Sequence, residues 1–170
     1  MAFVSPRQRE QTAERVAALL AADARIEGVV LVGSMAGIPD RWSDIDIEVV
    51  VGDAADPSVL ATEWTSRLYD ELPVVHHFQV AFGATLVRGF LLDSLLEVDL
   101  SFTPAAQLTI WGPEQPILDR SGRVAAAMAE PTEWAPGEPD WPVRPASPGT
   151  TCCMPVPRCA AVGYGRVCGI

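Results

Sequence analysis

The sequence predicts a fold of the α/β (α+β) class, in which helices flank a mixed β-sheet. Three observations support this prediction. The chain has 170 residues, of which 49% are hydrophobic and 20% charged, enough to bury one core. Segments with helical spacing alternate with short strand-like runs. A Pro-rich and Cys-rich C-terminal end follows them, and we expect it to be a disordered tail.

The N-terminal half begins with a helix, from Ser5 to about Ala24. Ser5 is its expected N-cap, Pro6 occupies the first helical position and Gln8 completes a capping box. Residues 28–32 form a short apolar run that ends at a glycine, as a buried strand does before a turn. Residues 44–51 then alternate acidic and apolar side chains, which predicts a half-buried strand.

The following segments continue the mixed pattern. Residues 57–72 have helical spacing and are closed by a proline. Residues 84–92 and 95–102 flank a short Asp-Ser turn and predict a β-hairpin. We further expect a strand at 108–111 and an Ala-rich helix at 123–130.

The composition changes after residue 130. Residues 131–157 contain 8 of the 15 prolines, and all four cysteines lie between positions 152 and 168 without paired C-x-x-C spacing. Proline at this density removes backbone donors and opposes helix and sheet. We therefore expect one domain at 1–130, followed at 131–170 by a Pro-rich linker and a disordered tail. We hypothesise a frameshift near Ala146, because codons that this tail sequence permits can be read in another frame as an amphipathic helical sequence.

Charge narrows the range of partners. The chain has 12 basic and 22 acidic residues, for a net charge of −10. Such a surface repels nucleic acid and anionic membranes, so neither is an expected direct partner. No apolar run is long enough to span a bilayer and no signal-peptide pattern opens the sequence, so we expect a cytoplasmic protein.

The candidate site is built from acidic residues. Asp44 and Asp46 lie two apart on a strand and therefore share a face, where like charges are costly without a cation between them. Hard oxygen ligands of this kind suit Mg²⁺. Asp99 lies on the second strand of the hairpin and is a candidate third acid. Gly33 allows close backbone approach, and Ser34 offers donors suited to a phosphate.

This pattern resembles the polymerase-β-type nucleotidyltransferase superfamily, in particular small bacterial members related to aminoglycoside and lincosamide nucleotidyltransferases. The resemblance spans roughly residues 29–102: Gly33-Ser34, then Ser43-Asp44-Ile45-Asp46, then Asp99. It implies a nucleotidyltransferase fold, with nucleotide-binding residues Gly33, Ser34 and Ser43. It also implies catalytic, metal-binding residues Asp44, Asp46 and Asp99, the last as third ligand or as base.

The resemblance implies a Mg²⁺-dependent enzyme. It would transfer a nucleoside monophosphate from a nucleoside triphosphate to a hydroxyl of a small, antibiotic-like acceptor, as in antibiotic resistance. Two alternatives remain: an antitoxin-type minimal nucleotidyltransferase that acts on a partner protein, and an inactive truncated remnant. Two features differ from the family pattern. Nine residues separate Ser34 from Asp44, one fewer than usual, and the C-terminal helical region is missing.

Overall fold

The computed structural model describes residues 4–37 and 43–130. The expected tail at 131–170, including the hypothesised frameshift near Ala146, therefore lies outside the described residues. So does most of the loop before Asp44. The element order begins α1 (Pro6–Ala21), β1 (Ile26–Val32), the short 3-10 turn η1 (Gly33–Ala36), β2 (Ile45–Val51) and α2 (Pro57–Glu71). It continues with β3 (Val74–Phe82), β4 (Thr85–Leu92), β5 (Glu97–Pro104), η2 (Ala105–Gln107), β6 (Glu114–Asp119) and α3 (Arg123–Ala129).

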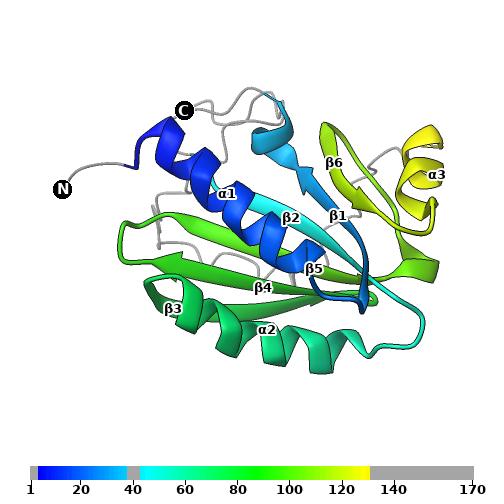
Figure 1. The fold of residues 1–170 in the computed structure, drawn as a ribbon, viewed down its shortest axis with the longest axis horizontal. Coiled ribbons are helices and arrows are strands. Elements are labelled where there is room, and N and C mark those ends of the chain that lie inside the picture. Colours follow the sequence, from blue (N-terminus) through cyan, green and yellow to red (C-terminus); the bar gives the residue numbers. More distant parts are fainter. Residues whose placement is uncertain (1–3, 38–42, 131–170) are drawn as a thin grey trace, which may run out of the picture. The chain divides into compact units, whose positions relative to one another are not determined.

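The six strands form one mixed sheet in the order β3-β4-β5-β2-β1-β6. Every neighbouring pair is antiparallel except β2 and β5, which are parallel. The predicted mixed sheet with flanking helices is confirmed (Figure 1).

Local sequence signals account for both long helices. In α1 the Ser5 hydroxyl accepts from the Gln8 backbone N–H, and the Gln8 side chain accepts from the Ser5 N–H, so the predicted capping box is present. In α2 the Asp56 carboxylate caps the first turn, and Pro57 follows at a position where no N–H is needed. Both helices start within one residue of their predicted positions.

One strand was predicted in the wrong place. Residues 108–111 are not a strand, and β6 instead runs from Glu114 to Asp119. Ile110 is 2% exposed and packs in the smaller core cluster, which explains its apolar character without a strand. The hairpin and the last helix agree with prediction, since β4 pairs with β5 and α3 covers 123–129.

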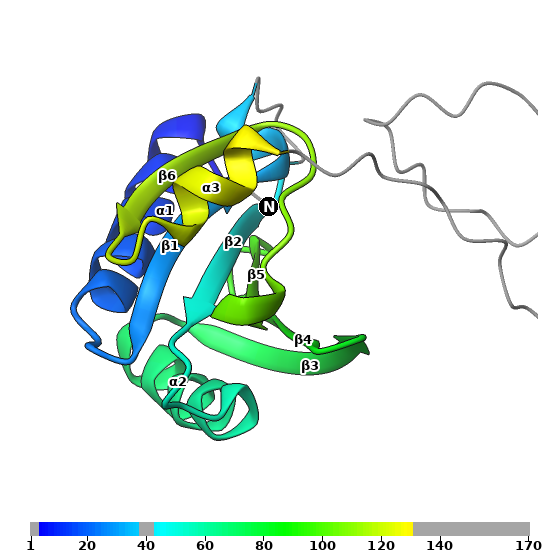
Figure 2. The same ribbon diagram turned by 90° about the vertical axis from the view of Figure 1, so that its right-hand side faces the viewer.

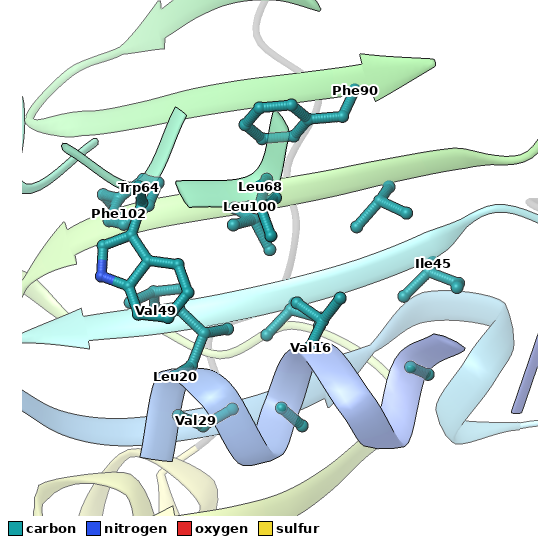
Figure 3. Packing of buried hydrophobic residues seen from close by; sticks show 14 of the residues in the cluster. Val16, Leu20, Val29, Ile45, Val49, Trp64, Leu68, Phe90, Leu100 and Phe102 are labelled. Atoms are coloured by element: carbon teal, nitrogen blue, oxygen red, sulfur yellow. The ribbon is translucent and has the colours of Figure 1, made fainter. Parts of the chain in front are cut away.

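The main core lies between the sheet and the two long helices. Its members come from alternate positions of the strands, such as Ile45, Ile47 and Val49 of β2, and from the inner stripes of α1 and α2. Figure 3 shows Trp64 and Leu20 of these helices packed over the strand side chains. Burying each of these side chains contributes roughly 1.5–3 kcal/mol to the free energy of unfolding. This face of the sheet is therefore covered by the core and does not form an open site.

The opposite face of the sheet is only partly covered. Here α3 packs beside β6 and β1 (Figure 2). Its Val124 belongs to a small buried cluster with Val30 and Val50. Gly28 lies beneath the helix, where an added Cβ would lie 2.6 Å from Val124 Cγ2. The even-numbered positions of β2 and the odd-numbered positions of β5 share this second face, and these are the acidic positions.

Candidate functional site: an acidic row across the sheet

Asp46 and Asp99 lie directly opposite each other on the two central strands. They are register partners in the parallel ladder of β2 and β5. Both point away from α1 and α2, because their neighbours Ile45, Ile47, Val98 and Leu100 fill the main core. Adjacent strands are about 4.8 Å apart, so the two carboxyl groups are close neighbours. Residues 53 apart in the sequence thus meet at one point.

Asp44 joins this pair at the N-terminal end of β2. A side-chain hydrogen bond links it to Asp46, and its charge acts on Asp46, Asp99 and Glu97. Burial, followed by the charges of Asp44 and Asp99, raises the pKa of Asp46 to about 7. The cluster therefore holds protons that isolated aspartates would lose well below neutral pH.

Asp99 has the same electrostatic character. Burial, followed by the charges of Glu97 and Asp44, raises its pKa to about 7. Its Oδ1 atom is buried and has no hydrogen-bond partner. A buried carboxylate oxygen without a partner is costly unless a proton or a cation reaches it.

Gly33 joins β1 to the turn that faces this cluster. Its φ of +66° lies in the left-handed region, and an added Cβ would lie 2.9 Å from Asp46 Oδ2. Glycine is therefore required here both by backbone conformation and by space. The turn therefore brings the backbone into direct proximity with the central carboxylate.

Ser34 follows in the turn, and its Oγ is buried without a hydrogen-bond partner. A buried hydroxyl without a partner is rare, and it is available to donate to an oxygen-rich ligand. Ser43 lies immediately before Asp44 and is half-buried. The structure thus brings Gly33 and Ser34 to Asp46, and Ser43 to Asp44 by chain continuity. Residues 38–42, including Trp42, lie outside the described residues.

Two further acids belong to the same face. Glu97 lies two residues before Asp99, and burial followed by the charge of Asp44 raises its pKa. Glu114 of β6 pairs with Val32, which itself pairs with Asp46, and the Glu114 Oε2 is buried without a hydrogen-bond partner. The Glu-x-Asp alternation places Glu97 on the same face as Asp99, but the sequence favoured a structural role for it. No sequence signal indicated Glu114, because its place in the cluster depends on the position of β6.

Glu48 continues the acidic alternation of β2 but is not part of the open cluster. Its Oε1 is buried without a hydrogen-bond partner, and burial raises its pKa to about 8, against a smaller lowering effect from Thr103. Glu48 lies two residues beyond Asp46 on the same face of β2, and at pH 7 its raised pKa favours the neutral form.

The chemistry of the cluster suits a divalent cation bound together with phosphate. Among the residues that the structure describes, no three His, Cys, Asp or Glu side chains already converge on a single ion position. Mg²⁺ usually takes only one or two carboxylates and completes its shell with water and substrate phosphates. The unpartnered Asp99 Oδ1 fits that pattern, as does the close approach of the Gly33 turn to Asp46.

Beyond Asp99 the face becomes apolar. Gly89 of β4 pairs with Asp99, and Phe78 of β3 pairs with Gly89. The Phe78 ring lies over Gly89, where an added Cβ would meet ring atoms at 2.2–2.8 Å. One row across the sheet therefore runs from an aromatic ring through glycine to the two central carboxylates.

Neither a family model nor a curated protein matches the sequence. Among solved structures, the chain is similar to an aminoglycoside 6-adenyltransferase from Bacillus subtilis, with a TM-score of 0.41 and 17% identity over 56% of this chain and 34% of that one. It is also similar to the non canonical poly(A) polymerase complex GLD-2 – GLD-3, with a TM-score of 0.43 and 17% identity over 59% and 36%. The chain spans about a third of each of those structures. Within the described ranges, no helix combines the length and apolarity needed to cross a membrane.

Proposed function

We propose that this chain is a metal-dependent nucleotidyltransferase that moves a nucleoside monophosphate from a nucleoside triphosphate to a hydroxyl of a small, antibiotic-like molecule. The acceptor oxygen forms a bond to the α-phosphorus. The bond from that phosphorus to the oxygen bridging to the β-phosphate breaks, and pyrophosphate leaves. One observation carries the proposal: Asp46 and Asp99 are register partners beside a left-handed glycine turn.

Asp44, Asp46 and Asp99 are the residues that would hold Mg²⁺. When bound, the metal neutralises the triphosphate and makes the acceptor hydroxyl easier to deprotonate. Without it, the carboxylates and the triphosphate repel each other, since every group in the row is acidic or neutral. We therefore expect nucleotide binding to require a divalent cation.

The turn residues have separate roles. Gly33 lets the backbone of the turn pack against Asp46, because a side chain there would collide with that carboxylate, and it thereby holds the turn next to the bound phosphates. The Ser34 hydroxyl donates a hydrogen bond to a phosphate oxygen, which gives this buried group its missing partner. Ser43 borders the same space from the chain segment before Asp44.

The acceptor approaches from the other side of the carboxylates. The turn lies on the β1 side of Asp46, whereas Asp99 lies on the side of β4 and Gly89. Asp99 is therefore the acid next to the acceptor, where it orients the hydroxyl and receives its proton. The apolar surface at Gly89 and Phe78 then supports the body of the acceptor.

Calorimetry with ATP and GTP tests the proposal. We expect binding in the presence of Mg²⁺ and none in EDTA, together with pyrophosphate release when a hydroxyl acceptor is supplied. Asp46→Asn should abolish pyrophosphate release, whereas Asp53→Asn, which alters an acid paired with Arg123 outside the row, should not. Equal nucleotide affinity in EDTA and in Mg²⁺ would contradict the metal-dependent site.

A further inference from the structure

We propose that β3 is a pairing edge, and that two copies of this chain associate through it into a homodimer with one continuous sheet. β3 is the end strand of the sheet and, within the described residues, pairs with β4 alone. Its outward N–H and C=O groups are therefore a template for another strand (Figures 1 and 2).

The side chains of β3 favour association. None of its nine residues is Asp, Glu, Lys or Arg, although the chain has a net charge of −10. Nine large hydrophobic residues are exposed in the described part of the chain, and four of them lie on this strand: Val75, Phe78, Val80 and Phe82. Phe82 is 67% exposed. A strand of this composition is unusual at an edge that remains in water.

The other edge of the sheet is different. β6 contains Pro116, which lacks a backbone donor, and has Glu114 and Asp119 at its two ends. Proline and charge are the usual features that prevent edge-to-edge pairing. One edge is therefore blocked and the other is open, which limits the assembly to two copies and prevents a continuous fibre.

A second copy fits this edge better than a charged partner. Two strands of the same sequence pair antiparallel about a two-fold axis, which satisfies both open edges at once. Two acidic chains would repel each other at most surfaces, but β3 brings no ionised carboxylate to the contact. A basic partner would instead be attracted to the acidic row.

The length of the regular part of β3 determines how tightly the two copies are expected to bind. The register with β4 shifts between Val74 and His76, so the straight segment runs from His76 to Phe82. A contact of this size is at the small end of specific interfaces, and we expect a dissociation constant of about 1–100 µM. The dimer should therefore form and dissociate within an accessible concentration range.

Sedimentation of the full chain in reductant tests the proposal, with the reductant excluding disulfides from the four cysteines. We expect a reversible change from 18.2 kDa to twice that mass as the concentration rises. Val80→Lys should weaken the dimer at least tenfold by placing like charges across the contact. The matched control is Ile117→Lys on β6, which is similarly exposed and should leave the dimer unchanged.

Hydrogen exchange distinguishes edge pairing from other contacts. The outward amides of 76–82 should gain protection as the concentration rises, and Val80→Lys should remove that gain. Phe82→Lys provides a second variant if Val80→Lys melts early. A chain that stays monomeric throughout the concentration range would overturn the proposal. So would a dimer that Val80→Lys and the control Ile117→Lys weaken equally, or a dimer in which the β3 amides gain no protection. Nucleotide binding should be unchanged in Val80→Lys, so a failure of this proposal leaves the proposed function intact.

Discussion

Replacing Asp46 with asparagine should stabilise the metal-free protein at alkaline pH while abolishing transfer. In the folded chain the pKa of Asp46 is about 7, compared with an ordinary value of 3.8. A folded pKa above the unfolded one means that the native state loses stability as the pH rises from about 4 through 7. Asparagine has no proton to lose, so the variant avoids that loss and can still donate to Asp44.

The structure gives the scale of the effect. A shift from 3.8 to about 7 corresponds to about 4 kcal/mol at about 1.4 kcal/mol per tenfold change. Solvent reaches part of the cluster and neighbouring protonation compensates, so we expect about 1–3 kcal/mol at pH 8, or roughly 3–9 °C in melting temperature. At pH 4 the gain should disappear, because the wild-type group is then protonated.

Thermal melts in EDTA at pH 4 and pH 8 measure this difference. Asp53→Asn is the matched control, because Arg123 lowers the pKa of Asp53 and its removal should give no gain at pH 8. Two results would refute the reasoning. One is an Asp46→Asn protein less stable than wild type at pH 8, and the other is an equal gain at both pH values.

Three further predictions follow from the same face of the sheet. The wild-type melting temperature in EDTA should fall between pH 5 and pH 8, because the pKa values of Asp46 and Asp99 are both raised to about 7. Mg²⁺ should restore part of the lost melting temperature. A melting temperature that rises over this pH range would contradict the burial of these acids. Gly33→Ala should lower the free energy of unfolding by about 1–2 kcal/mol, since the φ of this residue is +66° and the new Cβ would crowd Asp46. It should also weaken Mg²⁺-dependent ATP binding in calorimetry. An unchanged affinity would show that the turn does not contact the nucleotide. Gly89→Val should lower the melting temperature by displacing the Phe78 ring, and Phe78→Ala should partly rescue it; strictly additive effects would show that the two residues are independent.

Local patterns predicted most of the fold. The Ser5 capping box, the alternation of β2 and the short turn between β4 and β5 are each encoded within a few residues, and the structure confirms them. β6 was misplaced because it is an edge strand whose pairing with β1 is non-local, and because Pro116 conceals it as a loop. The apolar run at Ile110 was read as a strand although it fills a core instead.

Local patterns likewise predicted some features of the candidate site, whereas others depend on pairing between strands that are distant in sequence. The spacing of Asp44 and Asp46 predicted a shared face, and the hairpin predicted that Asp99 alternates with core residues. No local pattern could specify that Asp46 and Asp99 are exact register partners, since that depends on a parallel pair formed across a long crossover. The apolar continuation through Gly89 and Phe78 likewise follows from cross-strand register.

The parallel pairing of β2 and β5 also has a consequence for the order of folding. The two strands are joined by a crossover that contains α2, β3 and β4, whereas most other neighbouring strands in the sheet are close in sequence. Loop-closure entropy therefore makes this central contact late, after the β3-β4-β5 meander has formed. The same step brings Asp46 and Asp99 together. The repulsion between their carboxylates therefore raises the free-energy barrier of this late step and does not affect the earlier formation of the meander. A divalent cation that binds these carboxylates should consequently speed refolding, most strongly above pH 7.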